Sequence, residues 1–395
     1  MWIHRGISSV LERLAAQRPA VVLTGARQAG KTSLLRRLFP AHTFVSLELP
    51  AEAALAEEDS ATFLARHPPP VVVDEVQYAP GLFRHLKTDI DAHRKEKARF
   101  LLTGSQKFLL MQGVSDSLAG RAGILELETL SWAEIHAALP NISLEEVLLR
   151  GGYPELYDEL ELDHREYYRS YFATYLERDV RSLLNVGSLR DFERFVRVCA
   201  LRSGQLLNKS ELGRDVGISA PTANQWLSVL AASNQIFLLE PWFANKSKSV
   251  VKTPKLYWAD AGFLAWLLGI QSLEELLRSP YLGAIWETFV YSELRKRQAA
   301  AQDVASLFFY RDRSREVDFL IHRGGRFELL EAKSALTPTS RDVQPLNDVS
   351  ELLGAHRVLA RRVICRCTTA HPIGQARAVG PNDAWFETDR PLPLR

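Results

Sequence analysis

The chain has 395 residues, of which 46% are hydrophobic and 24% are charged, and its formal net charge is only +2. This length predicts about two to four globular domains, and the balanced charge means that any nucleic-acid site must be a local patch. The sequence begins without the apolar core of a signal peptide, contains no apolar run long enough to cross a bilayer, and has three cysteines, too few for a disulfide framework. We therefore expect a cytoplasmic protein with no membrane contact.

A phosphate-binding motif opens the chain. Residues 20–39, AVVLTGARQAGKTSLLRRLF, predict an apolar strand, a glycine-containing loop and an amphipathic helix, and the loop matches G-x-x-x-x-G-K-[ST] at every fixed position. Backbone N–H groups of such a loop curl around phosphates at the positive end of the helix. Lys31 is expected to reach the β- and γ-phosphates and Thr32 to hold Mg²⁺. The expected ATP-binding residues are Gly25, Ala26, Arg27, Gln28, Ala29, Gly30, Lys31, Thr32, Ser33 and Asp74.

Two further strands carry polar groups at their carboxyl ends, where ligands bind in open α/β sheets. Residues 68–80, PPPVVVDEVQYAP, predict a buried strand that ends in Asp74 and Glu75. We expect Asp74 to orient the Mg²⁺ shell and Glu75 to polarise the attacking water. The strand RFLLTGSQ ends in Thr103 and Ser105, and Ser105 is the favoured sensor of the γ-phosphate, although hydroxyl groups at strand ends are also common in turns.

The middle of the chain predicts a pair of helices. Residues 208–233, NKSELGRDVGISAPTANQWLSVLAAS, contain two helical patterns around a Gly-Ile-Ser turn, with Ser210 and Ser219 as the expected helix caps. A strand follows at 234–243. On the second helix, Gln225 is a candidate for contact with DNA bases, whereas Trp226 is more typical of a core.

A basic segment follows this strand. Residues 244–258, ANKSKSVVKTPKLYW, contain no acid, and their lysines are Lys246, Lys248, Lys252 and Lys255. The order of helix, turn, helix, strand and basic segment is typical of a winged helix. Such modules often mediate packing, but unopposed positive charge favours contact with nucleic-acid phosphates. We therefore expect DNA as a partner.

A hairpin near the C-terminus brings acidic residues together. Residues 316–333, EVDFLIHRGGRFELLEAK, predict two strands that turn at adjacent glycines. In this register Asp318 lies opposite Glu331 and Glu316 lies opposite Lys333, with all four side chains on one face. Directly opposed like charges destabilise a sheet. Either the register is wrong or a cation lies between the carboxylates; alternatively, Lys333 simply neutralises Glu316 on a solvated face.

The motifs of the first half resemble the AAA+ ATPase superfamily. Longer strings resemble bacterial and archaeal ATP-binding proteins with a DUF4143 C-terminal region, namely LTGARQAGKTSLL, VVVDEVQYAPGLFRHLK, FLLTGSQKFLL, SLAGRAGILELETLS, GGYPE and YLERDV. The resemblance implies self-association into a ring or other homo-oligomer, in which an arginine of a neighbouring subunit completes the ATP site. Arg121 lies in the segment expected for this arginine, with a structural role as an equal alternative, and Arg150 is a candidate in the lid.

The C-terminal part resembles the PD-(D/E)xK nuclease superfamily, in which two carboxylates hold Mg²⁺ and a lysine orients or activates the attacking water. The matching residues are Asp318, Glu331 and Lys333, supported by Glu287 in the helix expected at 281–297. The resemblance therefore identifies the cation between the two strand carboxylates as Mg²⁺. Many members of this fold have lost these residues and only bind, whereas the set is intact in this chain.

Together these features predict an α/β protein of four parts. They are an AAA+ P-loop ATPase core at 1–130, a helical lid at 131–180, a winged helix at 181–255 and a PD-(D/E)xK nuclease-like domain at 256–395. The expected function is ATP hydrolysis coupled to engaging DNA, with Mg²⁺-dependent DNA cleavage by the C-terminal domain as a further activity. The alternative is a nucleotide-gated switch whose C-terminal half binds DNA or a partner protein without cutting.

Overall fold

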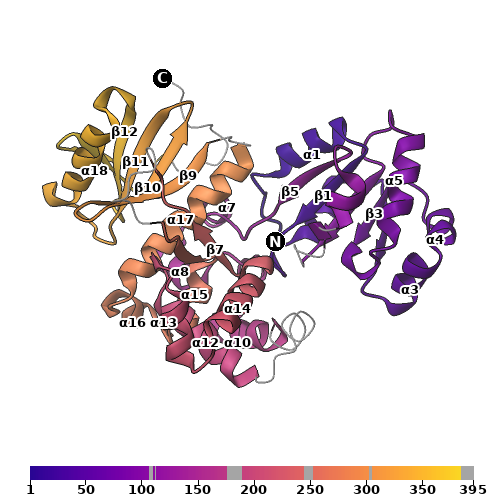
Figure 1. The fold of residues 1–395 in the computed structure, drawn as a ribbon, viewed down its shortest axis with the longest axis horizontal. Helices are drawn as coiled ribbons and strands as arrows, with labels where there is room; N and C mark the ends of the chain where they lie inside the picture. The colour runs from indigo at the N-terminus through magenta and orange to yellow at the C-terminus, as the bar shows by residue number, and fades with distance from the viewer. Residues whose placement is uncertain (106–109, 112, 176–188, 244–251, 302–304, 384–395) are drawn as a thin grey trace. The chain divides into compact units, whose positions relative to one another are not determined.

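The computed structural model in Figure 1 has two compact units, one formed mainly by residues 1–130 and the other mainly by residues 131–395. The residues that the structure describes are 1–105, 110–111, 113–175, 189–243, 252–301 and 305–383. No helix in these ranges is long and apolar enough to span a membrane.

A five-stranded parallel sheet forms the centre of the first unit. Its strands lie in the order β2 (Thr43–Ser46), β3 (Val71–Asp74), β4 (Phe100–Gly104), β1 (Ala20–Thr24) and β5 (Ala122–Glu126). The three middle strands are continuously buried, which is typical of a parallel sheet covered on both faces. Because β4 pairs with both β1 and β3, the carboxyl ends of these three strands lie side by side, as expected from the sequence.

Helices cover both faces of this sheet. The buried side chains of α3 (Pro50–Glu58), α4 (Ser60–Arg66) and α5 (Leu82–Ala92) join one hydrophobic cluster with alternate residues of the middle strands. Helices α1 (Ser8–Gln17) and α2 (Lys31–Leu38) contribute nothing to that cluster and contact β1, β4 and β5, so they lie on the opposite face. Two short turns complete the unit, η1 (Val76–Tyr78) and η2 (Val114–Leu118).

The second unit begins with short helices. They are α7 (Trp132–Ala138), α8 (Leu144–Arg150), α9 (Glu155–Asp158) and α10 (His164–Tyr175), followed much later in the chain by α15 (Ala261–Leu267) and α16 (Leu273–Arg278). Serine–glutamate capping boxes begin α7 and α8 and satisfy their first backbone N–H groups. The end of α8 packs directly on the beginning of α15, where a Cβ on Gly262 would lie 2.2 Å from the backbone nitrogen of Gly151. This close approach explains the first glycine of the GGYPE string.

Three helices and a small sheet form the middle of this unit. Along the chain they are α12 (Leu189–Leu201), β6 (Gln205–Leu206), α13 (Lys209–Val216), α14 (Ala220–Ala232), β7 (Ile236–Leu239) and β8 (Lys255–Trp258), and β8 lies between the other two strands. Ser219 accepts a hydrogen bond from the Thr222 backbone and caps α14 as predicted. The prediction for Ser210 is wrong, because this residue lies inside α13 and Asn208 caps that helix. Trp226 is buried against Phe192 and Phe195, so its assignment to the core is confirmed.

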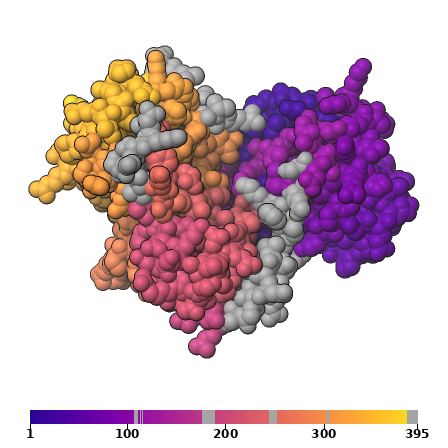
Figure 2. Space-filling view, in the orientation of Figure 1, coloured from indigo at the N-terminus to yellow at the C-terminus, as the bar shows by residue number. Residues whose placement is uncertain are grey.

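The predicted boundary between residues 255 and 256 is wrong, because it falls inside β8. This strand pairs with both β6 and β7, and the helices that follow it, α15 and α16, pack on α8. The C-terminal region therefore begins with the next helix, α17 (Leu282–Ala301). In the space-filling view the described parts of 189–243 and of 256–383 form one continuous body (Figure 2). The predicted boundary between lid and winged helix, at 180, lies outside the described residues.

A six-stranded mixed sheet forms the C-terminal region. Its order is β13 (His371–Ile373), β14 (Ala376–Val379), β12 (Val358–Ile364), β11 (Arg326–Ala332), β10 (Glu316–Arg323) and β9 (Ser306–Arg311). The meander from β9 to β11 is antiparallel, whereas β12 runs parallel to β11 and β14. Helix α18 (Ser340–Leu353), with the turn η4 (Ala355–Arg357) after it, connects β11 to β12 and packs on one face. Helix α17 packs on the other, where Tyr291 stacks on Phe319.

Candidate functional sites

The predicted phosphate-binding loop connects β1 to α2. Gly25 has φ +146°, and a Cβ at this position would lie 2.0 Å from the carbonyl oxygen of Leu127, so only glycine fits. Gly30 has φ +93° and begins α2. The Lys31 side chain is only 6% exposed and donates to the carbonyls of Gly25 (3.0 Å) and Ala26 (2.8 Å). The ammonium group therefore lies over the loop, as the motif predicts.

Buried side chains and the hydrogen bonds of Arg5 hold the rest of the loop in place. Ala26 and Ala29 are buried, whereas Gln28 and Ser33 are exposed. Arg5, which is buried, donates from Nη1 to the Ala29 carbonyl at 2.8 Å and from Nη2 to the backbone that follows β5. Sequence reasoning missed this arginine, because it lies far upstream of the loop in a segment without a motif. Its contact joins the loop to the edge of the sheet.

The predicted Mg²⁺ ligands of the loop and of β3 meet. The Thr32 hydroxyl donates to Asp74 Oδ1 at 2.9 Å, and Thr103 at the end of β4 donates to the same oxygen. Burial raises the pKa of Asp74, and the adjacent Glu75 carboxylate adds to this effect, while the two hydroxyl groups oppose it. A hydroxyl and a carboxylate oxygen are ligands that Mg²⁺ prefers. The pair fits a magnesium ion bound beside the phosphates.

Glu75 is held in a defined orientation. Its φ of +55° is rare for a residue with a side chain and places it in the left-handed region, where η1 begins. Its Oε2 accepts hydrogen bonds from Ser105 Oγ at 3.1 Å and from Gln77 Nε2. Ser105, predicted to sense the γ-phosphate, therefore orients Glu75 in this structure. Gln77 was missed by sequence reasoning, and its only signal was its place in the turn after the acidic pair.

The two candidate arginines make other contacts. Arg121 forms a two-pronged ion pair with Asp91 on α5, with both N–O distances at 2.8 Å, and this contact lowers the pKa of Asp91. Arg121 is thus engaged within its own subunit, and its role toward a neighbouring ATP site stays a prediction. Arg150 donates hydrogen bonds to the backbone carbonyls of Leu156, Leu160 and Leu162. These contacts give it a structural role in the α8–α10 region.

The predicted register of the C-terminal hairpin is confirmed from the turn out to Phe319, whereas the predicted pairs Asp318–Glu331 and Glu316–Lys333 lie beyond the ladder. The ladder of β10 and β11 pairs Arg323 with Arg326 and continues outward to the pair of Phe319 and Leu330. Next to this pair the register of β10 against β9 shifts, so that β10 bulges at Asp318. Bulges change the direction of side chains. The Oδ2 atom of Asp318 accepts a hydrogen bond from the backbone N–H of Ala332 at 3.0 Å.

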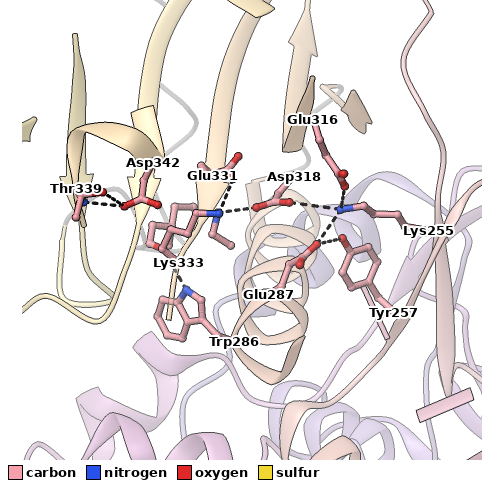
Figure 3. A network of polar contacts seen from close by, with 12 residues as sticks. Lys255, Tyr257, Trp286, Glu287, Glu316, Asp318, Glu331, Lys333, Thr339 and Asp342 are labelled. Atoms are coloured by element: carbon pink, nitrogen blue, oxygen red, sulfur yellow. Dashed lines mark hydrogen bonds and ion pairs between the residues drawn. The ribbon is translucent and has the colours of Figure 1, made fainter. Parts of the chain in front are cut away.

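A buried lysine lies among the acidic residues (Figure 3). Lys255, predicted to be part of a DNA-binding wing, is only 2% exposed. Its Nζ lies 3.1 Å from Glu287, 2.8 Å from Glu316 and 3.4 Å from Asp318. Tyr257, also on β8, donates to Glu287. The prediction for Lys255 is wrong because its partners are distant in sequence, so the lysines of this segment appeared unopposed. Lys252 is exposed, and Lys246 and Lys248 lie outside the described residues.

The predicted neutralisation of Glu316 by Lys333 is also wrong. Lys333 binds Glu331, with Nζ 2.7 Å from Oε1, and is partly exposed. Glu316 instead binds Lys255 and, at 3.2 Å, Arg311. A cation does lie among the carboxylates, as the register argument requires, but it belongs to the protein. We refer to Glu287, Glu316, Asp318 and Glu331 as the carboxylate cluster.

Burial shifts the pKa values of the side chains in and around this cluster. It raises the pKa of Glu331 to about 8 and that of Glu287 to about 7, and the Asp318 carboxylate adds to both shifts. Burial lowers the pKa of Lys255, but the three carboxylates around it outweigh burial and raise the pKa overall. Glu331 Oε2 is buried and has no hydrogen-bond partner in the described part of the chain. The cluster therefore has one carboxylate oxygen that is free to accept a ligand.

The fit of a divalent cation to this cluster is partial. Asp318 and Glu331 are buried neighbours of the kind that hold divalent ions, and Glu331 offers a free oxygen. Yet among the described residues no group of three or more His, Cys, Asp or Glu side chains is arranged to hold a metal ion. The structure thus brings together the predicted residues Glu287, Asp318, Glu331 and Lys333, but with Lys255 between the first two.

Comparisons with protein families agree with this division of the chain. An AAA domain matches residues 17–136, a domain of unknown function called DUF8612 matches 141–274, and a second, DUF4143, matches 282–383. The first unit is therefore an AAA-type P-loop ATPase domain, and the chain joins it to a DUF4143 region. The end of the DUF8612 match, beyond β8, agrees with the boundary found in the structure.

Two mycobacterial proteins are similar along most of the chain. They are the uncharacterized proteins Rv2008c of Mycobacterium tuberculosis and Mb2031c of Mycobacterium bovis, each 33% identical over 341 residues, which cover 85% of this chain and 75% of the relative. The chain belongs to the family of these proteins.

Similar folds among solved structures include a Walker-type ATPase of Pyrococcus abyssi, at 19% identity and a TM-score of 0.44, which covers 66% of this chain and 94% of that one. The RuvB Holliday junction branch migration motor of Thermotoga maritima has 16% identity and a TM-score of 0.33, and the match covers 60% of this chain and 89% of that one.

Proposed function

We propose that this protein binds ATP with Mg²⁺ and hydrolyses it. The observation that carries the proposal is the contact of Thr32 with Asp74, beside a Glu75 side chain fixed by Ser105 and Gln77. In this arrangement Lys31 neutralises the β- and γ-phosphates, and Thr32 and Asp74 hold Mg²⁺, which offsets the charge that develops in phosphoryl transfer. Glu75 orients and polarises the attacking water.

Two substitutions test this proposal. Lys31→Ala removes the phosphate contact and should abolish nucleotide binding, measured by titration with a fluorescent ATP analogue. Glu75→Gln keeps the shape of the side chain and should bind ATP normally, yet lower the hydrolysis rate by about 100-fold, the usual range for loss of a general base. Glu58→Gln, an exposed acid on α3, is the matched control. Equal hydrolysis by wild type and Glu75→Gln would refute the role of Glu75.

We infer that hydrolysis is coupled to engaging DNA through residues 189–258. Their element order, two helices around a turn followed by two strands, is that of a winged helix, and Gln225 is exposed on the second helix. The burial of Lys255 weakens the basic-wing argument, which now rests on Lys246, Lys248 and the exposed Lys252.

The salt dependence of binding tests this inference. Replacing Lys246 and Lys248 by alanine should weaken DNA binding on every sequence and reduce the log–log salt slope by about one unit for each lost phosphate contact. The double substitution Lys95→Ala with Lys97→Ala removes the same charge from an exposed segment of the first unit and should leave the slope unchanged. If both double variants behave alike, DNA does not bind through this segment.

Metal-dependent cleavage by the DUF4143 region is a second candidate function. The free, buried Oε2 of Glu331 next to Asp318 and Lys333 favours it, whereas the contact of Lys255 with Asp318 favours the alternative, a switch that binds without cutting. Nicking of plasmid DNA with Mg²⁺ or Mn²⁺ distinguishes the two. Cleavage that is lost in Asp318→Asn and in Lys333→Ala supports the nuclease, and no nicking by the wild type supports the switch.

A further inference from the structure

Lys255 occupies the position that a cation would take in the carboxylate cluster. Its ammonium group is nearly completely buried and lies within 3.4 Å of Glu287, Glu316 and Asp318, which come from α17 and β10. Figure 3 shows these carboxylates converging on the Nζ atom from different sides. A buried lysine requires such partners, because an unpaired charge in the interior costs several kcal/mol.

The spacing of these carboxylates is set by the lysine. Their oxygens lie 2.8 to 3.4 Å from Nζ, whereas oxygen ligands lie about 2.0–2.1 Å from Mg²⁺ and about 2.3–2.6 Å from Ca²⁺. Carboxylates that surround an ammonium group are therefore held too far apart to share a metal ion. This explains why the described residues contain no ready metal-binding group, although four acids meet there.

The same oxygen of Asp318 faces both candidates for the cation position. Asp318 Oδ2 accepts the backbone N–H of Ala332, and its Oδ1 contacts Lys255, so a metal ion that binds Oδ1 would replace a contact of the lysine. A divalent ion on Oδ1 would lie only a few ångströms from the ammonium group and would be strongly repelled by it. The lysine and the metal thus compete for one ligand.

We propose that the ammonium group of Lys255 and a divalent cation such as Mg²⁺ or Mn²⁺ exclude each other at the carboxylate cluster, Lys255 being the built-in cation of the site. The inference rests on the metal site of the second candidate function and not on the ATPase. The strand that carries Lys255, β8, is paired on both sides by β6 and β7. This pairing holds the ammonium group in the cluster.

Manganese binding to the full-length, nucleotide-free protein tests the proposal. Lys255→Met keeps most of the side-chain length and removes the charge, and Lys252→Met makes the same change at an exposed lysine on the same segment. We expect Lys255→Met to bind Mn²⁺ at least tenfold more tightly than the wild type, measured from the free-ion electron paramagnetic resonance signal. Lys252→Met should match the wild type, and adding Asp318→Asn to Lys255→Met should remove the gain.

The outcomes separate this inference from the function on which it rests. Equal, measurable Mn²⁺ affinity in the wild type and Lys255→Met would overturn the exclusion and leave the metal site intact. Absence of binding in both would overturn the exclusion and the metal site together. If Lys255→Met does not fold, the double variant that combines Lys255→Met with Glu287→Gln restores the charge balance. It must then bind Mn²⁺ at least tenfold more tightly than Glu287→Gln alone, and equal affinity of these two variants would also overturn the exclusion.

Discussion

The backbone conformation and hydrogen bonds of Glu75 fit the catalytic role that we propose for its side chain. Its left-handed backbone, with φ +55°, is unfavourable for a residue with a Cβ, and the cost is offset by hydrogen bonds to its carboxylate from Ser105 and Gln77. The same bonds fix the oxygen that would face the attacking water. Residues beyond the motif therefore position the side chain that we propose as the base.

Loss of the Gln77 contact should slow hydrolysis without weakening ATP binding. A hydrogen bond to a charged group contributes about 1.5–3 kcal/mol, and each 1.4 kcal/mol corresponds to tenfold in rate. We therefore expect Gln77→Ala to lower kcat about tenfold or more and to leave the nucleotide Kd unchanged, as measured by steady-state hydrolysis and equilibrium binding. Gln17→Ala, at an exposed glutamine on α1, is the control. A changed Kd with normal kcat would mean that Gln77 supports the loop rather than Glu75.

At the scale of elements, the contact between α8 and α15 holds the second unit together. Asp260, the cap of α15, accepts the backbone N–H of Gly152 at 2.7 Å and the hydroxyl of Tyr168 at 3.0 Å. These bonds are formed because the two helix ends approach so closely that neither Gly151 nor Gly262 has room for a side chain. A helix more than one hundred residues downstream thus completes the first helices of this unit.

A single methyl group should break this contact. A Cβ on Gly262 would lie 2.2 Å from a backbone nitrogen, which cannot move aside as a side chain could. We expect Gly262→Ala to reduce the free energy of unfolding of the second unit by more than about 3 kcal/mol, at or above the upper end of overpacking costs. Gly283→Ala is the matched control, because it also adds one methyl group, has nothing within 4 Å and lies in α17. Similar denaturant midpoints for the two variants would contradict the packing argument.

At the scale of the whole molecule, we propose that an arginine of a neighbouring subunit completes the ATP site. The ion pair of Arg121 with Asp91 does not oppose this role, because both side chains are partly exposed and surface ion pairs contribute little to stability. A γ-phosphate from a neighbouring subunit could replace Asp91 as the partner. Self-association remains a proposal, and Arg121 is the residue through which it can be tested.

Mixing two inactive variants tests the shared site. Arg121→Ala retains its own loop and Lys31→Ala retains its own arginine, so some interfaces of a mixed assembly regain both groups. We expect the mixture to hydrolyse ATP measurably faster than either variant alone, in a phosphate-release assay. Asp91→Ala serves as the control and should keep most of its activity, because it leaves Arg121 in place. Full activity of Arg121→Ala would instead assign the arginine a purely structural role.

Local patterns predicted much of the ATP site and of the hairpin. The loop from Gly25 to Thr32, the acids after β3 and the register of Arg323 with Arg326 follow from short spacings, because each is formed by residues close in sequence. Even the meeting of Thr32 with Asp74 was predictable, since parallel strands bring their carboxyl ends together. The role of Arg5 was not predictable, because no motif lies near it in the sequence, and the only signal for Gln77 was its place in the turn after Asp74 and Glu75.

The sequence by itself determined that this chain has a phosphate-binding loop, a pair of acids beside it and a hairpin whose carboxylates need a cation. Only the tertiary structure decided which cation is present. Lys255 looked like one of four exposed lysines, and its partners Glu287, Glu316 and Asp318 follow it by 32 to 63 residues. A charge pattern along the chain reports only on nearby residues, whereas burial and pairing of β8 brought these distant charges together.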